Sequence, residues 1–197
     1  RALTDEECKL LLKTAGTGPV RLRMTGAERA ALYLTAITTG LRATELKRLK
    51  VADLRQGEHG HYLRVVAVRG KNKLEKRQPL APDVAAELVA FTKGRPDNDP
   101  MFSMPHSRHT AKIVKADLEA AGIPYKDADG NHADFHALRH TFVTRLVRTG
   151  ADAKIVQQLA RHSTPTLTLG RYSHAQEGEM RSAVTGAPSL TLDCNQG

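Results

Sequence analysis

The chain has 197 residues, of which 40% are hydrophobic and only 4% aromatic, so it is long enough for one domain with an aliphatic core. Thirty Lys and Arg against 21 Asp and Glu give a net charge of +9, which indicates a polyanionic partner, either nucleic acid or an anionic membrane. No apolar run approaches the ~20 residues of a transmembrane helix and no signal peptide is visible, so we expect no membrane partner.

Cys8 and Cys194 stand near opposite ends of the chain and form no disulfide framework, which favours a reducing, cytoplasmic location. The chain begins with Arg1 rather than Met, so we expect an excised domain. Its positive charge is concentrated: residues 42–77 hold 11 basic and four acidic side chains, and residues 136–172 hold six and one. This concentration argues for two polyanion-binding segments rather than a generally basic surface.

Local signals predict helices in the first quarter of the chain. Two capping boxes, each a Thr followed three residues later by a Glu, mark helix starts: Thr4 with Glu7, and Thr25 with Glu28. Gly40 is expected to end the second helix, and residues 42–50 to form the next one. Residues 61–68 and 76–80 have strand-like composition around a turn, which predicts one β-hairpin.

The second half of the chain is predicted to be helical with polar loops. Pro82 suits the first position of a helix that runs to about Thr92, because its missing N–H is harmless there. An amphipathic helix is expected at residues 108–121. A helix that contains His136 should end at Gly150, and a short helix should follow at residues 152–161.

Residues 136–172 carry the side chains that phosphoryl transfer without a metal needs. His136, Arg139 and His140 share one face of a helix, His162 follows the next short helix, and Tyr172 comes ten residues later. A guanidinium can neutralise a phosphate, an imidazole can move a proton, and a phenol can attack phosphorus.

This order resembles the His-x-x-Arg…His…Tyr motif of the tyrosine recombinases, the phage-integrase family. Residues 39–46, Thr-Gly-Leu-Arg-Ala-Thr-Glu-Leu, resemble the family's first motif, which carries its first catalytic Arg. A lone His-x-x-Arg would be weak evidence, but two blocks in order and at a family-like separation are specific. The resemblance covers roughly residues 3–175.

The resemblance implies a catalytic set of Arg42, Lys71, His136, Arg139, His162 and Tyr172. The two Arg side chains would hold the phosphate, His136 would accept a proton near the nucleophile Tyr172, and His162 would donate to a phosphate oxygen. Glu45 and His140 would support them. For Glu45 a simple surface pair with Arg42 is an equal alternative, and for Arg139 the alternative is a structural role on an apolar helix.

The family's general-acid Lys lies in the hairpin turn, and Gly70-Lys71 ahead of Pro79-Leu80 fits that pattern. Lys73 is the rival, because this turn departs from the usual Gly-Lys-Gly-Asn-Lys. For either Lys, the alternative is a turn side chain that touches the DNA backbone. The basic side chains expected to contact DNA are Arg69, Lys73, Lys76, Arg77, Arg161 and Arg171.

A metal site has one argument in its favour, since His132, His136 and His140 are spaced four apart near Asp134. Zinc-protease helices use His-Glu-x-x-His, whereas Ala137 stands at the Glu position here and Arg139 would repel a divalent cation. We therefore expect no metal and no cofactor.

The sequence thus predicts a mainly α fold with a small antiparallel β-sheet, the tyrosine recombinase catalytic domain, over residues 1–175. Residues 176–197 form a C-terminal tail, either assembly-related through residues 190–192 or disordered. The family's N-terminal core-binding domain is expected to be absent from this chain.

The implied function is site-specific recombination of double-stranded DNA through a 3′-phosphotyrosyl intermediate without ATP, by self-associated tetramers at the nucleoid. A type IB topoisomerase-like strand transferase shares this chemistry. A non-catalytic DNA-binding module would explain the charge but not the co-occurrence of the motif residues.

Overall fold

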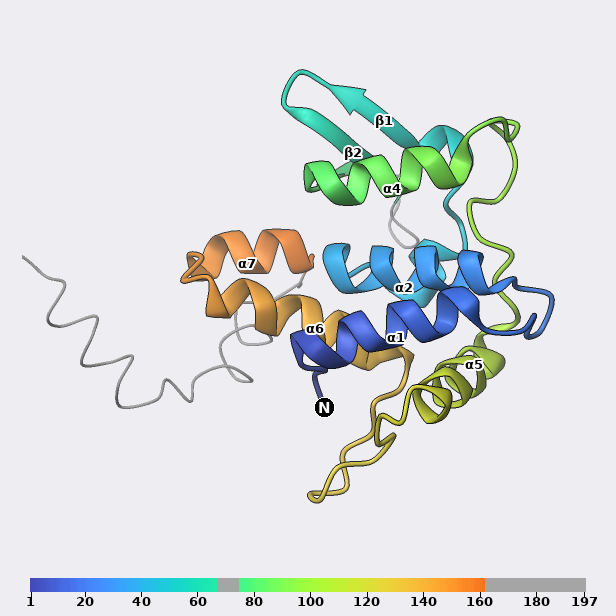
Figure 1. Ribbon diagram of the computed structural model, residues 1–197. Coiled ribbons are helices and arrows are strands. Elements are labelled where there is room, and N and C mark those ends of the chain that lie inside the picture. The colour runs from blue at the N-terminus through green and yellow to red at the C-terminus, as the bar shows by residue number, and fades with distance from the viewer. Residues whose placement is uncertain (67–74, 162–197) are drawn as a thin grey trace, which may run out of the picture.

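The computed structural model describes residues 1–66 and 75–161 of the chain. Helix α2 lies at the centre, and it packs against α1, α4 and α6 (Figure 1). Helix α5 contacts α1 and α6, and α7 packs on α6. The described helices are α1 (Asp5–Thr17), α2 (Gly26–Thr39), α3 (Ala43–Leu46), the 3₁₀ turn η1 (Val51–Asp53), α4 (Pro82–Thr92), α5 (Ser107–Ala120), α6 (Phe135–Arg148) and α7 (Ala153–Ala160).

A small antiparallel sheet lies beside α4, and its strand β2 contacts that helix (Figure 1). Its strands pair in the order β1 (Leu54–Gly57), β2 (Gly60–Val66) and β3 (Glu75–Pro79). In the register, Leu63 pairs with Gln78 and Val65 with Lys76, and Leu63 and Val65 are buried. The predicted mainly α fold with a small antiparallel sheet is confirmed.

Helix starts follow the predicted caps, with one difference. The Thr4 hydroxyl accepts from the Glu7 amide at 3.1 Å and the Glu7 carboxylate accepts from the Thr4 amide at 2.8 Å, so the first capping box is complete. Thr25 caps α2 by accepting from the Glu28 amide at 3.2 Å. The Glu28 carboxylate, however, accepts from the Ser103 amide, so it joins a distant loop to α2.

A helix was expected at residues 42–50, and its length is wrong: the regular α-helix there is α3, which ends at Leu46. The chain turns away there: Asp53 accepts from the Lys50 amide at 2.9 Å and starts η1, while the Met101 amide donates to the Leu49 carbonyl at 2.7 Å. This turn leads into β1, a strand that the sequence did not predict. Two strands were expected and the described residues form three.

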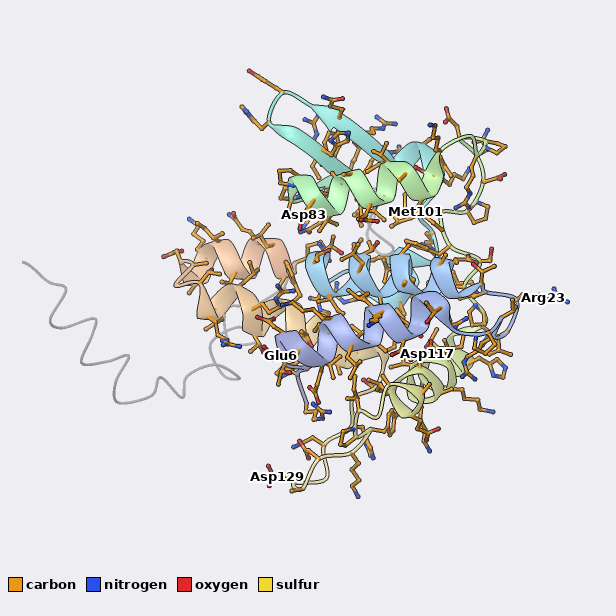
Figure 2. The ribbon with its side chains drawn as sticks, in the orientation of Figure 1. Glu6, Arg23, Asp83, Met101, Asp117 and Asp129 are labelled. Atoms are coloured by element: carbon orange, nitrogen blue, oxygen red, sulfur yellow. The ribbon has the colours of Figure 1, made fainter. Side chains whose placement is uncertain are left out.

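A buried ion-pair cluster ties α5 to α2. The Arg29 side chain is fully buried and donates from Nε to Asp117 Oδ2 at 2.8 Å, and the Tyr33 hydroxyl donates to the same oxygen at 2.8 Å. Arg29 also donates to the carbonyls of Pro19 and Met24, which anchors the loop between α1 and α2. Asp117 lies where α5 meets this helix pair (Figure 2).

Candidate active site

Arg42 stands at the end of a sharp turn. Gly40 has φ +61°, the left-handed conformation that ends α2 and is cheapest for glycine. Two residues later Arg42 precedes α3, and its side chain is 45% exposed. Its backbone N–H donates to Glu45 Oε2 at 2.7 Å and its Nη1 to Glu45 Oε1 at 3.3 Å. Glu45 therefore holds Arg42 while leaving much of the guanidinium open to solvent.

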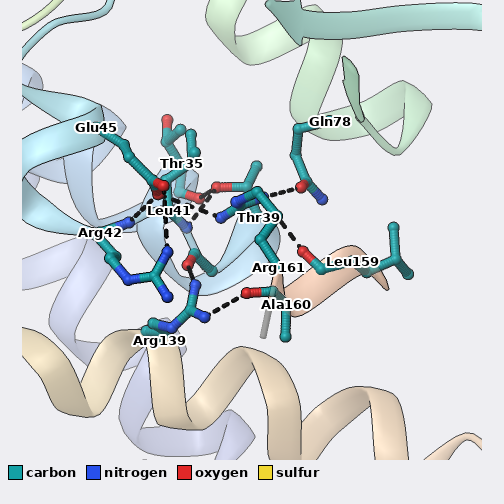
Figure 3. A network of polar contacts seen from close by, with 11 residues as sticks. Thr35, Thr39, Leu41, Arg42, Glu45, Gln78, Arg139, Leu159, Ala160 and Arg161 are labelled. Atoms are coloured by element: carbon teal, nitrogen blue, oxygen red, sulfur yellow. Dashed lines mark hydrogen bonds and ion pairs between the residues drawn. The ribbon is translucent and has the colours of Figure 1, made fainter. Parts of the chain in front are cut away.

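Arg139 is buried on α6, with 4% of its surface exposed. Its Nη1 donates to the Gly40 carbonyl and its Nη2 to the Ala160 carbonyl, as Figure 3 shows. A guanidinium has five N–H donors in a rigid fork, so one side chain can bond both carbonyls. Arg139 thereby joins the C-terminal ends of α2 and α7. The structural role considered for this Arg is present, and a phosphate-binding role stays a prediction.

Glu45 is shared between two cations. Its side chain is only 11% exposed, and its Oε2 lies 3.5 Å from Arg161 Nη2 as well as near the Arg42 amide (Figure 3). Glu45 is therefore more than a simple surface pair with Arg42, and the orienting role considered for it has a geometric basis.

Arg161 was predicted as a DNA contact, but its side chain is only 7% exposed. Its Nη1 donates to the Gln78 side-chain carbonyl in β3 and to the Leu159 carbonyl at 3.2 Å. The pKa of Arg161 is lowered, mainly by burial of the guanidinium. The Glu45 carboxylate opposes this shift, and the nearby charge of Arg42 adds to it. Its observed partners are protein groups, so a direct contact with DNA stays a prediction.

Gln78 belongs to this network, and sequence reasoning missed it. It is a buried polar residue of β3. The strand around it reads as an ordinary polar edge, and no local pattern indicates that its amide faces Arg161. The available signal was the pairing register, which places Gln78 opposite the buried Leu63.

The motif residue His136 and the supporting residue His140 lie one turn apart on α6. His136 is exposed in the first turn, and His140 is half-buried with its Nδ1 3.3 Å from the Thr144 hydroxyl. The Asp134 carboxylate caps this helix by accepting from the Ala137 amide at 3.0 Å.

His132 precedes α6, and its ring lies against that of Tyr125 with centroids 5.4 Å apart. The four-residue spacing of His132, His136 and His140 is therefore not the spacing of one helix. Within residues 1–66 and 75–161, no three His, Cys, Asp or Glu side chains gather as a metal site would need.

The predicted basic residues of β3 point in different directions. Lys76 pairs with the buried Val65 and so lies on the face of the sheet that also carries Gln78. Arg77 pairs with Arg64 on the opposite face, and its guanidinium lies over the Tyr62 ring at 5.0 Å. Of these two side chains, Lys76 is the one on the face of Arg161 and Glu45.

Several predicted site residues lie outside the described residues, and they stay predictions. They are Arg69, Lys71, Lys73, His162, Arg171 and Tyr172. Among the described tyrosines, Tyr33 is fully buried and its hydroxyl is bonded to Asp117. In the part of the chain that the structure describes, no helix is both long and apolar enough to span a membrane.

The model of the phage integrase family matches residues 1–179. The chain belongs to this family. It is 27% identical over 192 residues to tyrosine recombinase XerA of Pyrococcus furiosus, and the matched region covers 96% of this chain and 63% of that protein. It is 33% identical over 181 residues to tyrosine recombinase XerD of Vibrio vulnificus, and the matched region covers 84% of this chain and 54% of that protein. This integrase-family chain thus spans between half and two thirds of the length of these relatives.

Solved structures of the same family share the fold. The crystal structure of XerA recombinase matches with a TM-score of 0.71 at 22% identity, over 96% of this chain and 65% of that one. The catalytic domain of bacteriophage HP1 integrase matches with a TM-score of 0.67 at 18% identity, over 95% of both chains. A XerH site-specific recombinase bound to palindromic difH substrate, in a post-cleavage complex, matches with a TM-score of 0.68 at 19% identity, over 94% of this chain and 52% of that one. The fold of this integrase-family chain is therefore that of a catalytic domain.

Proposed function

We propose that this chain is the catalytic domain of a site-specific DNA recombinase, which cleaves and rejoins DNA strands through a 3′-phosphotyrosyl intermediate. The observation that carries the proposal is the contact between the two motifs. Arg139, from the second motif, donates to the carbonyl of Gly40, two residues before Arg42 of the first motif. The relatives of the same family are tyrosine recombinases by name.

The proposed reaction starts with the scissile phosphate beside Arg42 and Arg139. Their positive charge offsets the negative charge that builds on the two non-bridging oxygens as phosphorus becomes five-coordinate. His162 donates a hydrogen bond to one of those oxygens. In the resting protein the Arg42 guanidinium is half open to solvent, which suits a group that awaits a phosphate.

Tyr172 supplies the attacking oxygen and His136 accepts its proton. A P–O bond forms to the phenolic oxygen, and the P–O bond to the 5′ oxygen breaks as Lys71 protonates that leaving group. The products are a 3′-phosphotyrosine and a free 5′-hydroxyl. Attack by the 5′-hydroxyl of a partner strand reverses the step, and the phosphodiester energy is conserved, so ATP is not needed.

The partner is double-stranded DNA, and two strands from two duplexes must be exchanged. We therefore propose that four protomers assemble on DNA at the nucleoid, with residues 176–197 able to serve that assembly. A core-binding domain in addition to this chain would enclose the DNA together with it. Without one, binding by this chain alone should be weak.

The test is a nicked suicide duplex, from which the short 5′-hydroxyl fragment diffuses away after cleavage. The wild-type protein should accumulate a covalent protein–DNA adduct, and Tyr172→Phe should form none while keeping its DNA affinity. The phenolic oxygen is one group among many backbone contacts, so its loss should leave the dissociation constant within about threefold. An adduct in the Phe variant would identify a different nucleophile, and no adduct in the wild type would refute the proposal.

A further inference from the structure

Arg161 has a backbone conformation that is unfavourable for a residue with a side chain. It ends α7 with φ 53° and ψ 41°, the left-handed region that favours glycine, and it carries a long cationic side chain there that is only 7% exposed. Its Nε is buried without a hydrogen-bond partner. Strain and burial of a charge both oppose this arrangement, so a compensating interaction must maintain it.

The compensating contacts join three elements. From the end of α7, the Arg161 guanidinium bonds the Gln78 side chain of β3 and forms an ion pair at 3.5 Å with Glu45 of α3 (Figure 3). These partners lie 83 and 116 residues away in sequence. The backbone just before Arg161 is fixed as well, because Arg139 bonds the Ala160 carbonyl.

The Glu45 carboxylate needs this second cation when Arg42 is engaged elsewhere. Glu45 is 11% exposed and accepts from both the amide and the guanidinium of Arg42, at 2.7 and 3.3 Å. If the Arg42 guanidinium turns to a phosphate, a carboxylate this buried would lose its main counterion. An unpaired buried charge is strongly unfavourable, so Glu45 alone would hold Arg42 back from the phosphate. Arg161 stays beside Glu45 and removes that penalty.

We propose that Arg161 is a positioning residue for strand cleavage, which keeps Glu45 in place and charge-balanced so that the Arg42 guanidinium can bind the scissile phosphate. The inference rests on the proposed function and adds to it a residue that acts through another side chain. Arg161 makes no contact with the DNA in this role. Its effect should therefore appear in the rate of cleavage rather than in the affinity for DNA.

The first test compares Arg161→Gly, Arg161→Ala and Arg161→Lys in the full chain, with the nicked duplex at saturating concentration. Arg161→Gly should slow adduct formation by about 10- to 100-fold, the size expected when a catalytic group is slightly misplaced, and leave the dissociation constant within about threefold. Arg161→Lys should be intermediate, because an ammonium can pair with Glu45 but lacks the planar fork.

The glycine and alanine variants separate the side chain from the backbone. Both remove the guanidinium, but only glycine suits φ 53°, so Arg161→Gly should melt about 2–4 °C above Arg161→Ala at an equal cleavage rate. Lys115→Ala is the matched control, because it removes one positive charge from an exposed ion pair with Glu119, outside both basic segments. Its cleavage rate should equal that of the wild type.

The second test asks whether Arg161 acts through Glu45. In a Glu45→Gln background no carboxylate needs balancing, so Arg161→Gly should slow cleavage by less than about threefold more. A purely structural role for Arg161 would give the same factor in both backgrounds, and that result would overturn the inference. Cleavage by Arg161→Gly at the wild-type rate would also overturn it. A wild-type protein that forms no adduct would instead refute the proposed function.

Discussion

Arg139 of α6 donates a hydrogen bond to the carbonyl of Gly40, which lies 99 residues earlier at the end of α2. This bond fixes the distance between the two motifs, because Gly40 is followed after one residue by Arg42. It also depends on close packing, since α2 and α6 are in contact and the Phe142 ring lies against Gly40. The geometry of the arginine pair is therefore a property of the helix packing.

Gly40→Ala should destabilise the protein by about 2–4 kcal/mol. An alanine at φ +61° carries left-handed strain, and its Cβ would lie 2.3 Å from Phe142 Cδ1, so overpacking adds to the strain. Gly150→Ala is the matched control, with φ +74° and nothing within 4 Å of the added Cβ, and should lose only about 1–2 kcal/mol. Urea unfolding measures both. Equal losses would show that the contact with Phe142 does not matter.

Asp117→Asn should reduce the free energy of unfolding by about 3–5 kcal/mol, because it leaves the fully buried Arg29 guanidinium without its counterion. The pKa of Tyr33 is raised, first by burial and then by the Asp117 charge, so this phenol stays protonated and donates to the carboxylate. Glu119→Gln, in an exposed pair with Lys115, should change stability by less than about 0.5 kcal/mol. A small effect of Asp117→Asn would show that the cluster is not a stabilising link between α5 and α2.

DNA binding should weaken steeply with salt, and Lys76 should contribute to that dependence more than Arg77. Neutralising one phosphate releases counterions and adds about 0.9 to the slope of log K against log salt concentration. Lys76→Ala should lower the slope by about that amount, because Lys76 lies on the sheet face of Gln78. Arg77→Ala should leave it unchanged, because Arg77 lies on the opposite face over Tyr62, although its position in the sequence favoured a DNA contact. An equal decrease of the slope in both variants would show that the DNA is not confined to the sheet face of Gln78.

Lys71, rather than Lys73, should be the general acid. A 5′ alkoxide has a conjugate acid about as weak as water, pKa ~15.7, so a positioned ammonium is worth about 10²–10⁴ in rate. Replacing the 5′ bridging oxygen by sulfur gives a thiolate of pKa ~8.5, which leaves without a proton. Lys71→Ala should be slow on normal DNA and largely restored on the sulfur substrate. Rescue of Lys73→Ala instead would assign the role to that Lys.

The sequence by itself determined most of the helices, the first capping box and the family. Thr4 and Glu7 form the first capping box and Gly40 ends α2, because caps depend on contacts between residues three or four apart. The two motifs were also visible, since each lies within one short segment. The order of Arg42, His136, Arg139, His162 and Tyr172 along the chain was enough to indicate the family.

Only the tertiary structure decided what surrounds those residues. The strand β1 and the early end of α3 depend on contacts with residues 97–101, which no local pattern shows. The Glu28 carboxylate accepts from the Ser103 amide rather than from the amide of the N-cap residue Thr25. Arg161, predicted to contact DNA, is enclosed by Gln78 and Glu45. Glu45, Gln78 and Arg161 come from three separate elements, and their meeting depends on strand register and helix packing, which are set by long-range burial and not by neighbours in sequence.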